Sequence, residues 1–164
     1  MKRFLTTLAA AALLCPLASV ARTDPDTAEL IGVAKGFGAT VSYNDSEYCW
    51  PGIEGMFDSS KKLIVICHDG WPTDNDHDTV RHEMFHFAQS CAAEARGYKT
   101  LQPILTKPGQ LSTWVKSVLT DDQIVSIKSN YPRAKWRTEL EAAAAAQNYT
   151  AADIALILHL WCKD

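Results

Sequence analysis

Residues Asp78–Cys91 read DTVRHEMFHFAQSC, and this stretch holds two histidines four positions apart, His82 and His86. Half of its other residues are apolar and would pack around a helix, which predicts a helix that packs in a core. Side chains at positions i and i+4 lie on one face of a helix, so both imidazoles can point at a single metal ion. Zinc binds histidine nitrogens at about 2.0–2.1 Å. The stretch therefore predicts the central helix of the fold and a metal site on it.

Glu83 directly follows His82 and completes an H-E-x-x-H pattern. It lies about 100° around the helix from His82, beside the ion rather than on it. There the carboxylate can take a proton from a zinc-bound water and pass it to a leaving amine. The alternative is a core helix with two hydrogen-bonded histidines. Since burial of His82, Glu83 and His86 without partners would be costly, we favour one bound Zn²⁺ per chain with Glu83 as the catalytic base.

A catalytic zinc site needs a third protein ligand. The extended pattern H-E-x-x-H-x-x-G-x-x-H is excluded, because Gln89 and Ala92 occupy the positions of its glycine and its last histidine. A later stretch, Trp136–Ala143 (WRTELEAA), offers two carboxylates, Glu139 and Glu141. These glutamates lie about 200° apart on a helix, so only one of them can face the ion.

The segment Glu139–Ala142 resembles the E-x-E-A segment of compact gluzincins, metallopeptidases that bind zinc through H-E-x-x-H and a glutamate from a downstream helix. Prenyl-protein peptidases and regulatory peptidases of bacterial stress responses are among them. The first glutamate is generally the ligand there, so the resemblance implies Glu139, 53 residues after His86. In that family an Asp or Asn often follows the segment and orients a ligand histidine, whereas Ala143 stands here. Either another group orients the imidazole, or Glu141 is the ligand.

Two further questions about the later helices stay open. Both glutamates can also lie on a solvated helix face, paired with Lys135 and Arg137. Catalysis would in addition require a hydrogen-bond donor for the transition-state oxyanion beside the metal. Spacing singles out none of the candidate donors, which are Tyr131, Tyr149, Arg137, His159 and His77.

The first 21 residues are typical of a secretory signal peptide. Two basic residues precede an apolar run at 5–17, and Ser19–Ala21 supplies the small residues that signal peptidase needs. We expect cleavage after this segment and a single domain over residues 22–164. A lipoprotein anchor at Cys15 is the less favoured alternative, because the residues before it fit a lipobox poorly.

Charge and hydropathy restrict the partners of the mature chain. Loss of the leader removes two basic residues, so the formal charge moves from −3 to −5. A mildly acidic surface argues against nucleic acid as a partner. No other apolar run has membrane-spanning length, so we expect a secreted or periplasmic protein with no membrane contact after signal removal. The expected partner is a peptide or protein substrate, and the oligomeric state is not predicted.

Four cysteines remain after the leader is removed, and exported domains most often use them in disulfides. Of the three possible pairings we favour Cys49–Cys67 with Cys91–Cys162, because these bonds would join neighbouring strands and then two helices. A zinc site built from all four cysteines is excluded, since no two of them have the close spacing of such sites.

The whole sequence predicts an α+β fold, namely a compact zincin-like domain in which a small antiparallel sheet packs on the H-E-x-x-H helix and the C-terminal half is helical. The expected elements are a helix from Pro25 ended by Gly36 and Gly38, a strand at 39–43, a hairpin at 55–67, the H-E-x-x-H helix capped by Asp76 or Asp78 and stopped by Gly97, and helices at 111–119, 122–127, 133–147 and 151–161.

These observations predict a zinc metallopeptidase that hydrolyses peptide bonds with a zinc-bound water. The resemblance also implies that an extended peptide pairs with the edge strand of the sheet. One alternative is a zinc amidase acting on cell-wall peptides, which would share the site and differ in the cleft. Another is a non-catalytic, disulfide-bonded binding module with a structural metal. The intact Glu83 argues against that module, because a structural site needs only ligands.

Overall fold

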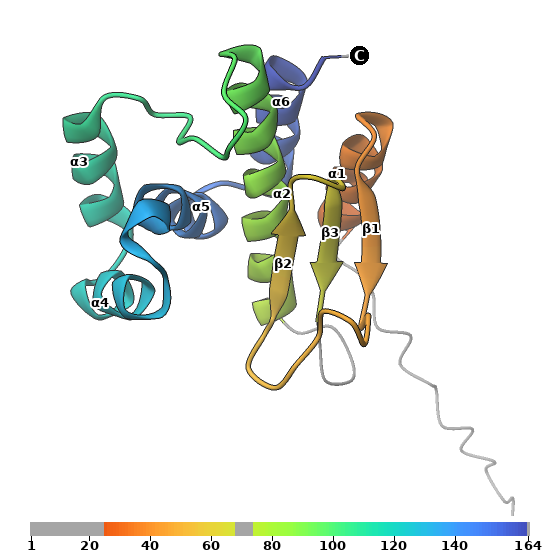
Figure 1. The fold of residues 1–164 in the computed structure, drawn as a ribbon, viewed down its shortest axis with the longest axis horizontal. Coiled ribbons are helices and arrows are strands. Elements are labelled where there is room, and N and C mark those ends of the chain that lie inside the picture. The colour runs from red at the N-terminus through yellow and green to blue at the C-terminus, as the bar shows by residue number, and fades with distance from the viewer. Residues whose placement is uncertain (1–24, 68–73, 164) are drawn as a thin grey trace, which may run out of the picture.

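The computed structural model describes residues 25–67 and 74–163, and the predicted signal peptide lies outside them. Within these residues, six α-helices and a three-stranded sheet form a mixed α+β fold with a helical C-terminal half, as predicted (Figure 1). The elements are α1 (Pro25–Gly36), β1 (Thr40–Tyr43), β2 (Gly55–Asp58), β3 (Leu63–Ile66), α2 (Asp74–Ala95), α3 (Pro108–Val118), α4 (Asp121–Asn130), a 3₁₀ turn η1 (Arg133–Lys135), α5 (Trp136–Asn148) and α6 (Ala151–Trp161).

The sheet has the strand order β1-β3-β2, with β3 in the centre. β2 and β3 form the predicted antiparallel hairpin, in which Gly55 lies opposite Ile66. β1, however, pairs with β3 in parallel, so the prediction of an antiparallel sheet is wrong and the sheet is mixed. The connection at 44–54 carries the chain across the end of the sheet and leaves room for β3 between β1 and β2 (Figure 1). The apolar β3 thereby takes the central, most buried place.

Helix α2 is the centre of the molecule and contacts β2, β3, α1, α5 and α6. It begins at Asp74, so the predicted caps Asp76 and Asp78 lie inside the helix. Acidic residues are favourable throughout the first turn of a helix. The presence of several aspartates therefore does not show at which of them the helix begins. The predicted stop is confirmed: Gly97 has a φ of 78°, and the N–H of Tyr98 donates to the carbonyl of Ala93 at 2.9 Å.

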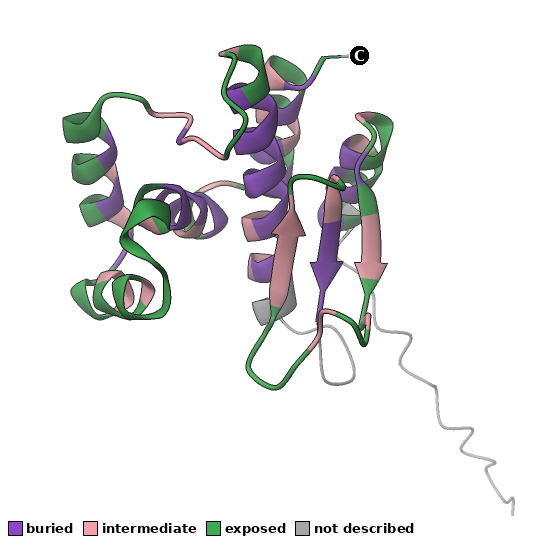
Figure 2. Cartoon of the chain, viewed as in Figure 1, coloured by how far each residue is buried: buried purple, intermediate pink, exposed green. Residues whose placement is uncertain are grey.

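The main core lies between α2 and the elements around it, and buried residues follow α2 and β3 along most of their length (Figure 2). Phe87, Met84 and Ile64 are fully buried there. α5 meets α2 through alanines, of which Ala142 and Ala145 belong to the same core. Because alanine is small, two helix backbones can approach closely at such a contact. This close approach brings polar side chains of α5 within reach of α2.

Both predicted disulfides are confirmed. Cys49–Cys67 joins the loop before β2 to the end of β3, and Cys91–Cys162 joins α2 to the residue after α6. Structural disulfides are typical of proteins in oxidising compartments. Among the helices that the structure describes, none has the length and apolar character needed to cross a membrane.

Candidate metal centre

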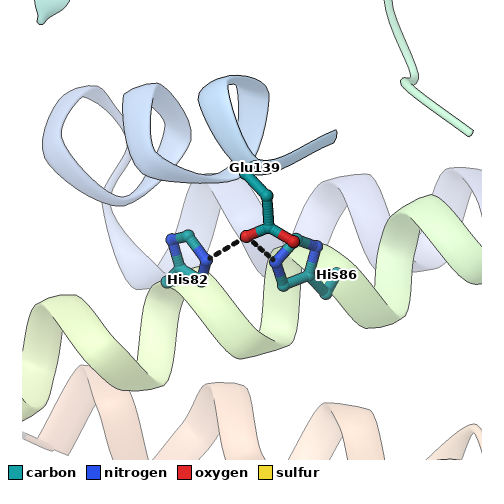
Figure 3. A group of neighbouring side chains, drawn as sticks. All are labelled: His82, His86 and Glu139. Atoms are coloured by element: carbon teal, nitrogen blue, oxygen red, sulfur yellow. Dashed lines mark hydrogen bonds and ion pairs between the residues drawn. The ribbon is translucent and has the colours of Figure 1, made fainter. Parts of the chain in front are cut away.

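Three side chains from two helices converge at one point of the structure. His82 and His86 lie on α2, and Glu139 of α5 points between them (Figure 3). The Oε2 atom of Glu139 lies 3.5 Å from Nε2 of His82 and 3.2 Å from Nε2 of His86. The potential ligand atoms of all three residues lie within 4.8 Å of one another. The structure thus brings together the three residues that were predicted as metal ligands, and this group can hold a metal ion.

The dimensions and the chemistry of this group fit zinc. Two ligands about 2.0–2.1 Å from a tetrahedral ion are about 3.3 Å apart. The two separations from Glu139 Oε2, 3.5 and 3.2 Å, are close to that value. Two imidazole nitrogens and one carboxylate oxygen also form a common donor set of catalytic zinc sites, which leave the fourth position open.

A glutamine one turn further along α2 orients His86. Oε1 of Gln89 lies 2.8 Å from Nδ1 of His86, while the amide nitrogen of Gln89 donates to Glu141 at 2.9 Å and to the carbonyl of Thr138 at 3.0 Å. Because these two acceptors fix the orientation of the amide, Oε1 must accept a hydrogen from Nδ1 of His86. The lone pair of neutral His86 is therefore on Nε2, which faces Glu139. Gln89 is thus the group that orients the imidazole of His86.

Glu141 has a different place and a different role. Its two carboxylate oxygens accept hydrogen bonds from the backbone N–H groups of Ile104 and Leu105, both at 2.7 Å. Glu141 is fully buried and Glu139 nearly so, which contradicts the alternative of a solvated helix face. Glu139, rather than Glu141, is therefore the glutamate that reaches the two histidines. The pKa of Glu141 is raised by burial, although its hydrogen bonds oppose this effect.

Glu83 lies beside the group and is not one of its three members. Its side chain is buried, and burial raises the pKa of its carboxyl above the ordinary value despite the nearby histidines. Gly55 of β2 lies directly against it: a Cβ atom at Gly55 would be 3.0 Å from Cγ of Glu83 and 2.7 Å from Cγ2 of Thr79. The edge of the sheet is thus in contact with the helix at the predicted base.

The charged forms of Glu139 and His86 stabilise each other. Burial alone would raise the pKa of Glu139, but the hydrogen bonds of His82 and His86 lower it to about 2. Burial alone would lower the pKa of His86, but the hydrogen bond to Glu139 and the charge of Glu83 raise it to about 9. An ionised carboxylate in this buried place requires a cation beside it, which either a protonated histidine or a metal ion can be.

Two cavities adjoin the group and share Ile53, Gly55, His82, Glu83 and Tyr131 in their linings. The polar cavity, of about 330 Å³, extends along α2 toward Asp78 and Thr79. The apolar cavity, of about 400 Å³, extends in the other direction toward His86 and Glu139. Its further lining is mostly apolar and consists of Tyr48, Trp50, Met56, Phe57, Leu101 and Lys135. All three residues of the group therefore line the apolar cavity, and His82 also lines the polar one.

Of the five candidate oxyanion donors, Tyr131 alone lines these two cavities. Its backbone is held by Trp136, whose indole Nε1 donates to the carbonyl of Tyr131 at 2.8 Å. Burial and the carboxylates of Glu139, Glu83 and Glu54 raise the pKa of Tyr131 to about 12, so its hydroxyl stays protonated. The other candidates have other partners. Tyr149 stacks on Trp114, and His159 meets the ring of Phe37 edge-on. Arg137 donates to the carbonyls of Leu105 and Thr106, and His77 contacts Thr27.

Gln89 and Gly55 are site residues that were not predicted from the sequence. Gln89 was noted only as a departure from the extended zincin pattern, although its i+3 spacing from His86 already places the two on one side of the helix. Gly55 was assigned to a hairpin, and no local signal distinguishes it from a turn glycine.

Comparison of this chain with models of known protein families, with curated proteins and with solved structures finds no match. The resemblance to gluzincins consequently rests on the two short segments quoted above and stays a prediction.

Proposed function

We propose that this protein is a zinc-dependent peptidase of the oxidising compartments outside the cytoplasm, secreted or periplasmic. The observation that carries the proposal is the convergence of His82, His86 and Glu139 beside a buried Glu83 that stands outside the ligand set. A purely structural metal site needs no such fourth carboxylate. The two disulfides and the predicted signal peptide support a location in an oxidising compartment outside the cytoplasm.

Three residues would hold the ion, and the chain supplies the proton transfers. A bound zinc ion would lower the pKa of a coordinated water to about 7 and polarise the substrate carbonyl. Glu83, whose pKa is raised by burial, takes the proton from the attacking water and returns it to the departing amine. The hydroxyl of Tyr131 donates a hydrogen bond to the oxygen of the carbonyl as negative charge develops on it.

The position of β2 supports an extended peptide as the substrate. In the described part of the sheet, β2 is an outer strand and pairs with β3 on one side. Its residues Gly55, Met56 and Phe57 line the cleft beside the metal group. A peptide that pairs with the outer edge of β2 would place a backbone carbonyl close to Glu83 and the ion. A hydrolase for non-peptide amides would have no use for this edge.

The test combines metal analysis with hydrolysis of a mixed peptide library by the mature protein. We expect about one zinc per chain, lost in His82→Ala and Glu139→Ala but retained in Glu83→Gln and Glu141→Gln. Peptide hydrolysis should be lost in the two variants that lose zinc. It should fall by a factor of about 10²–10⁴ or more in Glu83→Gln, since general base catalysis contributes that much.

Two outcomes would overturn the proposal. If no form of the protein binds zinc after purification without chelators and reloading, the metal centre is wrong. If zinc is bound but Glu83→Gln leaves hydrolysis unchanged, the observed activity does not come from this site.

A further inference from the structure

Helix α6 is apolar on almost every side but is covered on one side only. Its sequence, AADIALILHLW, has two polar side chains, Asp153 and His159. A helix that is apolar all round is normally buried. In the described chain α6 packs mainly against α1 and α2, while Leu156 and Leu160 remain 64 % and 71 % exposed. The uncovered side of α6 is therefore a surface that a partner can cover.

The two leucines lie together on the side of α6 that points away from the core. Leu158 is fully buried, and each of the two is two positions from it, about 200° around the helix. Leu156 and Leu160 are four positions apart, so one lies above the other on one face. Asp153 lies three positions before them, and Lys163 three positions after them. These four exposed residues, in the order acidic, apolar, apolar, basic, are the outer face of α6.

Helices α1, α2 and α6 run in the same direction (Figure 1). At one end, a ring nitrogen of His77 in α2 lies 3.1 Å from the hydroxyl of Thr27 in α1. At the other end, the disulfide Cys91–Cys162 joins α2 to the residue after α6. Phe37, directly after α1, meets the ring of His159 of α6 edge-on at the same end. The three helices therefore begin at one end of the molecule and finish at the other.

Charges are sorted between these two ends. Asp26 lies in the first turn of α1, and Asp153 lies in the first turn of α6. The basic residues at the other end, in or just after the last turns of the three helices, are Lys35, Arg96 and Lys163. Glu94 also lies there, but it pairs with Lys62 at 3.8 Å. A partner that covers the outer face of α6 must therefore offer an apolar centre between a basic end and an acidic end.

A second copy of this chain offers that pattern when its α6 lies antiparallel to the first. A twofold axis at the level of position 158 brings Leu156 of one copy against Leu160 of the other, and Asp153 against Lys163, because both pairs are centred on that position. Parallel packing would instead bring like charges together. We propose that the outer face of α6 is the interface of a symmetric homodimer, in which the two α6 helices pack antiparallel.

The outer face is preformed for this contact. The backbone N–H of Thr150 donates to Oδ2 of Asp153 at 2.9 Å in a capping box that fixes the start of α6, and the disulfide of Cys162 fixes its end. Little ordering is therefore required when two copies meet. The linings of the two cavities beside the metal group include no described residue of α6. Pairing through α6 thus leaves these cavities open, and the inference is independent of the proposed peptidase function.

The experiment measures the mass of the mature, disulfide-bonded protein by sedimentation equilibrium, from low micromolar to submillimolar concentration. An 11-residue helix is about 16 Å long, so the contact falls below the about 1,200 Å² of a stable interface, and we expect a dimer that dissociates on dilution. Leu160→Asp places an unpaired charge in the centre of the interface and should raise the dissociation constant by at least about tenfold. Val125→Asp on α4, where Val125 is 62 % exposed, is the matched control and should leave it unchanged.

A charge exchange tests the antiparallel arrangement separately. Asp153→Lys and Lys163→Glu should each weaken the dimer, because each brings like charges together, whereas the variant with both changes should dimerise more tightly than either single variant. A monomer at every concentration, a dimer that Leu160→Asp leaves intact, or a double variant weaker than both single variants overturns the proposal. A monomer that binds vesicles of anionic phospholipid, and loses this binding in Leu160→Asp, also overturns it and assigns the outer face to a membrane.

Discussion

At the scale of single residues, Gln89 decides which nitrogen of His86 faces Glu139, because its amide is fixed by Glu141 and Thr138. Removal of a group that orients a ligand histidine typically costs about 10–100-fold in metal affinity. We therefore expect Gln89→Ala to weaken zinc binding by about that factor, measured by competition with a chromogenic chelator. Gln102→Ala is the control, since this glutamine contacts Thr100 instead. Equal zinc affinities of Gln89→Ala and the wild type would contradict the role of Gln89.

Tyr131 is the second residue whose role can be isolated. Its hydroxyl is proposed to act on the developing oxyanion and not on the metal, so Tyr131→Phe should reduce kcat and leave the zinc content at one per chain. A single oxyanion donor typically contributes about 10²–10³ in kcat. If kcat of Tyr131→Phe equals that of the wild type, Tyr131 is not the oxyanion donor.

At the scale of secondary structure, the contact of β2 with α2 depends on the absence of a side chain at Gly55. A Cβ atom there would be 2.7 Å from Cγ2 of Thr79, closer than real contacts allow, and would press on Glu83. Overpacking of this kind typically costs about 1–3 kcal/mol, so we expect Gly55→Ala to lower the free energy of unfolding by about that much and to reduce hydrolysis. The measurement is urea denaturation together with an activity assay.

Two further variants make the Gly55 experiment specific. Thr79→Ser removes Cγ2 and should restore part of the stability lost in Gly55→Ala. Gly32 lies in the interior of α1, and among the described residues a Cβ atom there would meet no atom within 4 Å beyond its chain neighbours and the adjacent backbone of its own helix. Gly32→Ala should therefore stabilise the protein, by about 0.5–1 kcal/mol. If Gly55→Ala is as harmless as Gly32→Ala, the close contact between β2 and α2 does not exist in solution.

At the scale of the whole molecule, the two disulfides constrain very different lengths of chain. Cys91–Cys162 spans 71 residues and joins α2 to the end of α6, whereas Cys49–Cys67 spans 18 residues. Loop entropy alone assigns about 4 kcal/mol to the longer loop and about 3 kcal/mol to the shorter one. We expect the double variant Cys91→Ala/Cys162→Ala to be less stable in urea than Cys49→Ala/Cys67→Ala. The reverse order would show that strain or residual structure, and not loop length, determines the two contributions.

Local features of the sequence determined a large part of this protein. The pair His82 and His86, the helix that carries them and the turn at Gly97 follow from spacing and residue type within a few positions, which physical rules relate directly to helix geometry. The disulfide pairing was favoured among three possible ones because each bond would join elements expected to be neighbours, and the structure confirms it.

Only the tertiary structure decided the features that depend on how distant elements meet. It placed Glu139 rather than Glu141 against the histidines, gave Gln89 its partners on α5, and inserted β3 between β1 and β2 so that the sheet is mixed. The periodicity of a helix fixes which side chains share a face, but not the rotation of that face toward another helix. That rotation is set by packing, here by the small alanines of α5 against α2, and packing is a property of the whole core.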